Sequence, residues 1–437
     1  MLKNSSKSSE IPINQNNLNQ NNPDLSGEKI KILLVGYNGA NNTGSEARLH
    51  AIIADLKEIL GENVEITVPT LNQENLRRYL KETENIKIVP LPSIYFFTMR
   101  KLVKEHDIVI LVEGSCYMDT WTSALLWAFL WATKCADDFK KSSMAYAVDA
   151  GKLSSLNKRL VKREASKTDL IITRNYKSLE ILKSAGVTAP IEVTADCAFE
   201  LKLNPDNYNF IKETWPEAEN KLVGLSVVDF YLWPVVIRPW GRSEDQYKWP
   251  YYFSSSPKRD HQREALANSW AQMADHLIQK YQQNVALICM EDLDEPLARK
   301  ILEKMQYSEK AKIFSSNKYN ASEMTVLLRN LNLLLTSRYH ASVLSLSEKI
   351  PQVAIGHDTR LKNLYKEIGI YEEYFIDYTD PDLWQKVRNK AEKLLKSPES
   401  MQNTLKIGYD DQLKRAQKNK NLLKEFLKRS LNRKGMQ

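Results

Sequence analysis

The stretch Leu331–Leu346, LNLLLTSRYHASVLSL, joins two apolar runs through a short polar segment. The first run, Leu331–Leu335, has the length and composition of a buried strand, and the second, Ala341–Leu346, continues as a helix. A parallel strand that passes directly into a helix leaves the residues between them at the carboxyl edge of the sheet, where open α/β folds bind ligands. We therefore expect Arg338 and His340 to lie at such an edge.

The segment Ser337-Arg338-Tyr339-His340 has side chains that suit an anionic ligand. The guanidinium of Arg338 stays cationic and can bind phosphate or carboxylate through two parallel hydrogen bonds. An imidazole near a helix start can transfer a proton at neutral pH, and the backbone N–H groups there add to the attraction for anions. The structural alternative is an arginine in a salt bridge between lobes and a histidine that caps the helix.

Outside this stretch, short apolar strands alternate with amphipathic helices, which predicts an α/β fold with two doubly wound parallel sheets. The helix expected after the irregular segment Asp229–Arg263 begins at Ser269. Because Asp229–Arg263 is rich in Trp, Tyr and Pro, we interpret it as a long loop that contacts a ligand. The expected strands are residues 29–36, 64–68, 86–89, 107–112, 144–148, 170–173, 191–194, 222–228, 285–289, 313–314, 331–335 and 351–355.

Composition divides the chain into four parts. Residues 1–28 are rich in Asn, Gln, Ser and Lys and lack an apolar segment of signal-peptide length, so we expect a disordered leader. Residues 29–203 and 204–380 form the two predicted lobes, and a polar, proline-containing connection opens the second. Residues 381–437 are basic and helical in pattern, and we expect them to pack across both lobes.

Charge and cysteine usage favour a cytoplasmic protein with small-molecule partners. A net charge of +8 from 62 basic and 54 acidic residues is mild, and no nucleic-acid-binding module accompanies it, so we predict no nucleic-acid partner. The four cysteines show neither a metal-binding spacing nor the density of a disulfide scaffold, which predicts a reducing cytoplasm and no metal. The apolar stretch 124–132 falls short of the roughly 20 residues that span a bilayer. Peripheral association with the inner face of a membrane stays open.

A glycine-rich loop, Gly36–Gly44, follows the first strand and precedes the first helix. It lacks both the dinucleotide fingerprint and the Walker spacing. Asn41 and Asn42 can hydrogen-bond sugar hydroxyls, although asparagine also suits the left-handed geometry of turns. Glu46, in the first helical turn, is either a ligand contact or a carboxylate favoured there by the helix dipole. As a hypothesis, the acceptor-binding residues are Gly36, Gly39, Asn41, Asn42, Gly44 and Glu46.

These motifs resemble, in their order, the polysaccharide pyruvyl transferase family, whose members have two Rossmann-like lobes similar to GT-B glycosyltransferases. The resemblance covers most of the chain from about Lys31 to Phe375. Its most specific part is Arg338-x-His340 followed by a helix, a strand and Gly356-His-Asp-Thr-Arg360. The other parts are the glycine loop with Glu46-Ala47, Arg174 with Ser178–Gly186, and Ala195-Asp-Cys-Ala-Phe199.

The resemblance implies transfer of a pyruvyl group from phosphoenolpyruvate to paired hydroxyls of a sugar, with formation of a cyclic ketal and release of phosphate. Protonation of the enol methylene makes C2 electrophilic, so that a sugar hydroxyl can add. Phosphoenolpyruvate is a co-substrate and no cofactor is implied, while the acceptor is a lipid-linked or polymer-linked sugar of a surface polysaccharide. Arg338 and His340 are the expected catalytic residues, and the expected donor contacts are Ser337, Arg338, His340, Arg360 and Arg174.

The sequence departs from the family pattern at three places. Ser45 follows Gly44 where an aspartate is usual, and Arg360 stands where a lysine is usual. Glu113-Gly114-Ser115 replaces a glycine run, and its side chains would crowd a close backbone approach. These differences fit either an altered acceptor or loss of the ketal chemistry. Two other functions therefore stay open, a nucleotide-sugar glycosyltransferase on the same scaffold and a non-catalytic glycan-binding protein.

Overall fold

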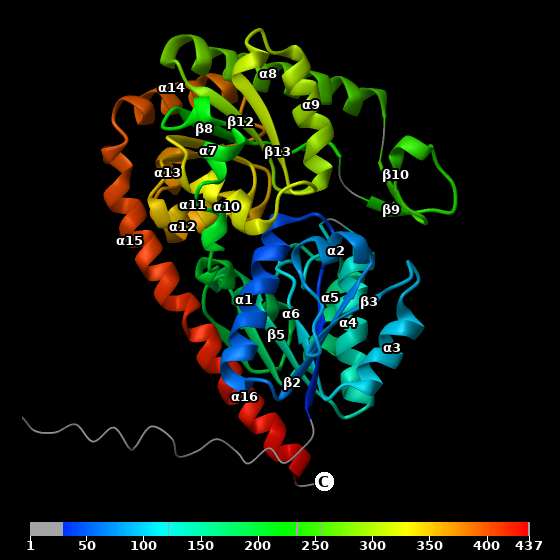
Figure 1. Ribbon diagram of the computed structural model, residues 1–437. Helices are drawn as coiled ribbons and strands as arrows, with labels where there is room; N and C mark the ends of the chain where they lie inside the picture. Colours follow the sequence, from blue (N-terminus) through cyan, green and yellow to red (C-terminus); the bar gives the residue numbers. More distant parts are fainter. Residues whose placement is uncertain (1–28, 121, 233–234, 255, 436–437) are drawn as a thin grey trace, which may run out of the picture.

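The computed structural model describes residues 29–435 except 121, 233–234 and 255. The predicted leader, residues 1–28, lies outside the described residues. Two parallel sheets, each covered by helices, stack one above the other, and the C-terminal helices α15 (Glu399–Ala416) and α16 (Lys418–Gly435) run along one side of both (Figure 1). The prediction of an α/β fold with two parallel sheets is confirmed.

The first sheet has seven strands in the order β3-β2-β1-β4-β5-β6-β7, and every neighbouring pair is parallel. Helices cover both faces, so the interior strand β1 is buried on both sides except at Lys31. The strands are β1 (Ile30–Val35), β2 (Val64–Thr70), β3 (Ile86–Pro90), β4 (Ile108–Leu111), β5 (Ser142–Val148), β6 (Leu170–Thr173) and β7 (Ile191–Val193).

The second sheet has six parallel strands in the order β13-β12-β8-β14-β15-β16. Its strand β14 lies between β8 and β15, so the segment that contains Arg338 leaves the middle of the sheet at its carboxyl edge, as predicted. The strands are β8 (Leu222–Ser226), β12 (Asn284–Cys289), β13 (Ala311–Ser315), β14 (Leu333–Thr336), β15 (Gln352–Gly356) and β16 (Phe375–Asp377).

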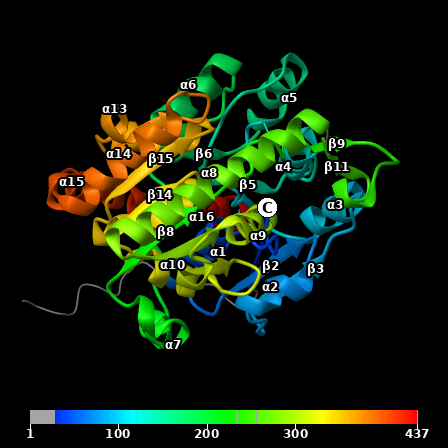
Figure 2. The ribbon, with the colours of Figure 1, turned by 90° about the horizontal axis from the view of Figure 1, so that it is seen from above.

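The helices of each lobe lie around its sheet (Figure 2) and connect its parallel strands. In the first lobe they are α1 (Thr43–Leu60), α2 (Gln73–Tyr79), α3 (Phe96–Glu105), α4 (Ser123–Asp138), α5 (Ser155–Ala165) and α6 (Tyr176–Ala185). Later in the chain they are α7 (Phe210–Thr214), α8 (Pro257–Tyr281), α9 (Glu295–Lys304), α10 (Ala321–Arg329), α11 (Tyr339–Ser345), α12 (Thr359–Glu367) and α13 (Tyr371–Tyr374). None of the described helices has the length and apolar character needed to cross a membrane.

The segment Asp229–Arg263, expected as a loop, contains regular structure. It forms a small antiparallel sheet in the order β10-β11-β9, and α8 begins at Pro257 instead of Ser269. Ser256 caps this helix, because its hydroxyl accepts a hydrogen bond from the backbone N–H of Arg259 at 3.3 Å. The first turns of α8 are almost wholly polar, so they show no apolar period. The strands β9 (Val235–Ile237), β10 (Gln246–Lys248) and β11 (Tyr251–Phe253) are too short to show one.

The C-terminal helices α14 (Leu383–Lys396), α15 (Glu399–Ala416) and α16 (Lys418–Gly435) join the two lobes. Met401 and Leu405 of α15 pack into the core of the second lobe. Phe426 of α16 packs into the core of the first lobe together with Leu423 and Leu427. The chain therefore returns to its first lobe after completing the second, which holds the lobes in contact.

We expect Phe426→Ala to lower the free energy of unfolding by about 3–5 kcal/mol, because truncation of a buried aromatic ring leaves a cavity. Phe426 is 4% exposed, whereas Phe97, the matched control, is 86% exposed. Urea denaturation of both variants checks the expectation. Equal stability of Phe426→Ala and Phe97→Ala would contradict the role of α16 in the core of the first lobe.

Candidate active site

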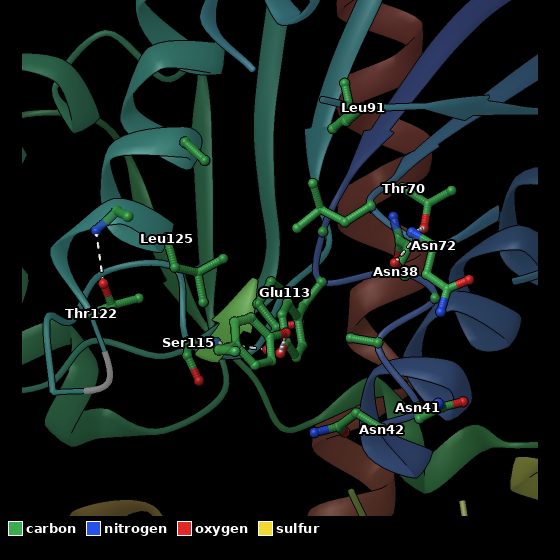
Figure 3. Close-up of a pocket in the computed structure, with 18 of the residues that line it drawn as sticks. Asn38, Asn41, Asn42, Thr70, Asn72, Leu91, Glu113, Ser115, Thr122 and Leu125 are labelled. Atoms are coloured by element: carbon green, nitrogen blue, oxygen red, sulfur yellow. Dashed lines mark hydrogen bonds between the residues drawn. The ribbon is translucent and has the colours of Figure 1, made fainter. Parts of the chain in front are cut away.

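A cavity of about 380 Å³ lies where the carboxyl edges of the two sheets face each other. The first lobe lines it with the loops that follow β1, β2 and β4, and the second lobe with residues that follow β12, β14 and β15. Figure 3 shows side chains of the first lobe around it, including Asn38, Asn72 and Glu113. This is the position at which doubly wound sheets bind ligands.

Arg338 lines this cavity and is held by two carboxylates of its own lobe. Its Nη1 lies 2.9 Å from Oε2 of Glu291, and its Nε donates to Oδ2 of Asp294 at 2.9 Å. Burial lowers the pKa of Arg338, but Asp294 and Glu291 together raise it by more, so the net shift is upward. The guanidinium is therefore a fixed cation at the cavity wall. Its salt bridges lie within the second lobe, not between lobes.

Arg360 lines the same cavity from the loop after the neighbouring strand β15. Its Nη2 donates to Oδ2 of Asp358 at 2.6 Å, and its Nη1 donates to the hydroxyl of Ser115 in the first lobe at 3.3 Å. Asp358 also caps α12, accepting from the backbone N–H of Arg360 at 2.9 Å. Burial raises the pKa of Asp358, but Arg360 and His357 together lower it by more, so the net shift is downward. The ionised carboxylate thus orients Arg360.

Asp196, which is fully buried, pairs with two arginines of the first lobe beside the contact between lobes. Its Oδ1 accepts from Nη1 of Arg48 at 2.9 Å, and its Oδ2 accepts from Nη1 of Arg174 at 2.5 Å. Arg174 also donates to Oδ2 of Asp149 at 2.8 Å. Burial raises the pKa of Asp196, but the two guanidiniums lower that pKa well below its usual range. We call Asp196, Arg48, Arg174 and Asp149 the buried ion cluster.

The second lobe contacts this cluster through the start of α11. Nε2 of His340 lies 3.4 Å from Oδ2 of Asp196, and the guanidinium carbon of Arg174 lies 4.1 Å from the centre of the Tyr339 ring. The imidazole also packs on Gly44, where a Cβ would fall 1.8 Å from Nδ1 of His340. Burial lowers the pKa of His340, although Asp196 opposes the shift. A glycine at position 44 is therefore required by close approach.

The structure places five of the predicted ligand contacts outside the lining of the cavity, namely His340, Arg174, Ser337, Gly44 and Glu46. Arg174 and Ser337 are buried, and the guanidinium of Arg174 is occupied by the two aspartates of the ion cluster. His340 faces Asp196 and Gly44. Arg338 and His340, two residues apart on either side of the helix start, thus point to different partners.

Glu46 connects the two lobes. Its Oε1 accepts from the backbone N–H of Ala321, the first residue of α10, at 2.6 Å. Its Oε2 lies 3.7 Å from Nη2 of Arg78. Burial raises the pKa of Glu46 to about 8. The carboxyl group is therefore an interlobe contact outside the cavity.

The glycine loop lines the cavity over residues 36–42, and Gly44 lies outside it. Gly39 and Asn41 have the left-handed φ values of 74° and 50°, which a turn of this kind requires. The side chain of Asn42 caps α1 by accepting from the backbone N–H of Ser45 at 3.0 Å. The backbone carbonyl of Asn41 accepts from the N–H of Asp292 at 3.0 Å. Turn geometry and interlobe contact thus account for both asparagines.

Sequence reasoning missed several residues at the cavity. Glu113 and Ser115 line it, and Oε2 of Glu113 accepts from the hydroxyl of Ser45 at 3.0 Å. Their place directly after a buried strand is the same signal that indicated Arg338. Tyr247 and Tyr251 of the small sheet also line the cavity, where Tyr247 hydrogen-bonds Tyr37. The aromatic composition of Asp229–Arg263 indicated that this segment contacts a ligand, but no sequence signal distinguishes these two tyrosines from the other aromatic residues of the segment.

Two facing parallel-sheet lobes with a ligand-sized cavity between their carboxyl edges define a GT-B-like fold. The S. aureus MnaA structure with UDP has a TM-score of 0.59 at 13% identity, covering 92% of this chain and 97% of that one. The Neisseria meningitidis UDP-GlcNAc 2-epimerase bound to UDP-GlcNAc has a TM-score of 0.58 at 12% identity, covering 91% and 100%. A glycosyltransferase from Rickettsia africae has a TM-score of 0.53 at 13% identity, covering 92% and 99%. At such identities the similarity shows the fold alone.

The polysaccharide pyruvyl transferase family model matches residues 42–359, so this chain belongs to that family and is a transferase. The matched region begins in the glycine loop, includes Arg338 and ends one residue before Arg360. No curated protein matches the sequence.

Asp196→Asn should lower the free energy of unfolding by about 3–5 kcal/mol, because it leaves two buried guanidiniums without their shared carboxylate. Asp411 is a suitable control, since its salt bridge with Arg415 involves an aspartate side chain that is 55% exposed. Asp411→Asn should cost less than about 1 kcal/mol. Urea denaturation measures both, and a similar small loss in the two variants would contradict the importance of the ion cluster.

Proposed function

We propose that this protein transfers the pyruvyl group of phosphoenolpyruvate to two hydroxyls of a sugar, forming a ketal during the biosynthesis of a surface polysaccharide. The observation that carries the proposal is the pair Arg338 and Arg360 on one cavity wall, in a chain that belongs to the pyruvyl transferase family. Phosphoenolpyruvate has two anionic groups, a phosphate and a carboxylate. Two guanidiniums from adjacent strands suit a ligand of this kind.

The two arginines are prepared for this task by their carboxylate partners. Asp294 and Glu291 hold Arg338, and Asp358 holds Arg360, so neither guanidinium needs to reorganise when an anion enters. Preorganised donors of this kind stabilise developing charge better than water does. The phosphate is the leaving group, and negative charge grows on it as the C2–O bond breaks. Retention of charge by both arginines thus favours departure of phosphate.

Proton balance requires a base near the acceptor. When two hydroxyls add to C2, one of their protons ends on the methylene carbon, which becomes a methyl group, and the other ends on phosphate. Glu113 is the carboxylate of the first lobe at the cavity, and Ser45 and the backbone N–H of Ser115 donate hydrogen bonds to it at 3.0 and 3.3 Å. We assign Glu113 as the group that accepts a hydroxyl proton.

The contact between Ser45 and Glu113 gives two of the departures from the family pattern a common explanation. The carboxylate usual after Gly44 is replaced by a hydroxyl, and a carboxylate from the end of β4 hydrogen-bonds that hydroxyl. The carboxylate is therefore supplied by Glu113, after β4, in place of the residue after Gly44. This arrangement supports retained chemistry with a reshaped acceptor site. His340 then acts as a positioning residue that holds the glycine loop through Gly44.

Arg338→Lys should lower phosphate release from phosphoenolpyruvate by about 100-fold or more in the presence of an acceptor sugar. Lysine keeps a cation beside Glu291 and Asp294 but lacks the planar fork that binds an anion through two hydrogen bonds. Arg433→Lys is the matched control, because Arg433 is 65% exposed on α16 and pairs with Asp169. A colorimetric phosphate assay with a panel of lipid-linked and nucleotide-linked sugars measures both.

Other outcomes of this assay identify other functions. Nucleotide release from a nucleotide sugar, without use of phosphoenolpyruvate, would indicate a glycosyltransferase. Sugar binding without release of either product would indicate a glycan-binding protein. Wild-type phosphate release by Arg338→Lys would remove the proposed role of Arg338.

Glu113→Gln should lower kcat by about 100-fold to 10,000-fold with little change in the KM for phosphoenolpyruvate, because the amide keeps the shape and the hydrogen bond from Ser45 but cannot accept a proton. Ser45→Ala removes only the hydrogen bond and should retain most of the activity. Steady-state kinetics at saturating acceptor separate the two variants. An unchanged kcat in Glu113→Gln would refute its assignment as the base.

A further inference from the structure

One side of the molecule exposes large apolar and aromatic side chains close to the cavity. In the part of the chain that the structure describes, nine such side chains are more than half exposed, and five of them come from two short segments, residues 94–97 and 237–249. Phe97 is 86% exposed and Trp240 is 76% exposed. The five are Ile94, Phe97, Ile237, Trp240 and Trp249, and we call them the aromatic rim. Single exposed apolar residues are ordinary, but such a concentration marks an interaction surface.

The two segments of the rim are in contact, although they belong to different lobes. The hydroxyl of Tyr251 in β11 donates to the backbone carbonyl of Ser93 at 3.2 Å, beside Ile94. Ile237 pairs with Tyr251 in the small sheet, and Nε1 of Trp249 donates to the carbonyl of Pro239 at 3.3 Å. Figure 1 shows α3 and the small sheet on the same side of the molecule, and Figure 2 shows them next to each other in the view from above. The rim is therefore one surface.

The rim continues into the wall of the cavity. In and beside the first segment, Leu91, Tyr95 and Met99 line the cavity, whereas Ile94 and Phe97 are exposed. On either side of the second segment, Val235 and Tyr251 line the cavity, whereas Ile237 is exposed. The cavity thus changes from cationic at Arg338 and Arg360 to apolar toward the rim. An acceptor that fits both parts is polar at one end and apolar at the other.

The charge around the rim matches an anionic surface. Among the side chains that the structure describes in residues 91–105 and 235–253 are five cations, Arg100, Lys101, Lys104, Arg238 and Arg242, against two anions, Glu105 and Asp245, with Asp138 of α4 pairing with Arg100 at 2.9 Å. Tryptophan and phenylalanine beside lysine and arginine are the residues that settle at the headgroup level of a bilayer. Anionic headgroups attract basic segments of this kind.

We propose that the aromatic rim rests on an anionic lipid bilayer and presents the apolar end of the cavity to an acceptor anchored in that bilayer. The bilayer receives Phe97, Trp240 and Trp249 at its interface, and the sugar of the acceptor extends toward Arg338 and Arg360. Docking itself depends only on the rim and its charge. The orientation of the acceptor rests on the proposed function.

The test is sedimentation of the full chain with vesicles of phosphatidylglycerol or of phosphatidylcholine at low salt. We expect binding to the phosphatidylglycerol vesicles, weaker binding to phosphatidylcholine, and loss of binding as salt is raised. Phe97→Ser combined with Trp240→Ser should weaken binding to phosphatidylglycerol by about tenfold, because two aromatic side chains no longer enter the interface. The control combines Leu156→Ser with Tyr208→Ser, two side chains that are each 61% exposed outside the rim.

Failure of the wild-type protein to bind phosphatidylglycerol vesicles would overturn the proposal. Equal binding to both lipids, or an equal loss in the control variant, would do the same. A dimer in solution that dissociates on Phe97→Ser with Trp240→Ser would show that a second copy of this chain occupies the rim instead. Vesicle binding needs no turnover, so a protein that binds vesicles but releases no phosphate would refute the proposed donor and leave the docking surface intact.

Discussion

The arrangement of the two lobes depends on the buried ion pairs that the carboxylate of Asp196 forms with Arg48 and Arg174. Asp196 is the first residue of the turn that leads out of the first sheet, and its Oδ1 also accepts from the backbone N–H of Ala198 at 2.9 Å. Two arginines from distant positions in the first lobe converge on it, while Tyr339 and His340 of the second lobe pack against the same cluster. A buried charge is tolerated only when its partners are in place. The ion cluster therefore specifies how the start of α11 meets the first lobe.

That contact determines where Arg338 lies. Arg338 is the N-cap residue of α11, one position before Tyr339, so its backbone is held by the packing of Tyr339 on Arg174. Its side chain turns the other way, toward Glu291 and Asp294 at the cavity. The start of α11 thus directs Tyr339 and His340 to the ion cluster and Arg338 to the cavity. The opposite end of the cavity, lined by Leu91, Met99 and Val235, adds an apolar surface.

The position of a residue at the cavity was predictable where it depends only on the strand that the residue follows. It was not predictable where the side chain turns to a partner from another part of the chain. Arg338, Arg360, Gly36, Gly39, Asn41 and Asn42 lie at the cavity because each follows the carboxyl end of a parallel strand or its loop. Arg174 also follows such a strand, yet its guanidinium turns to Asp149 and Asp196, which come from other parts of the chain. Glu46 likewise pairs with α10 of the other lobe. Nothing in the local sequence separates a cation that meets a ligand from one that meets a buried carboxylate.

The sequence by itself determined the class of fold, the order of nearly all strands and helices along the chain, and the sheet edge at which the cavity lies, because apolar periodicity and turn residues are local properties. It also indicated the family through its ordered motifs. Only the tertiary structure decided that His340 faces Asp196, that Glu113 contacts Ser45, and that Tyr247 and Tyr251 cover the cavity. These contacts join residues far apart in the chain, and their geometry depends on how two lobes pack against each other.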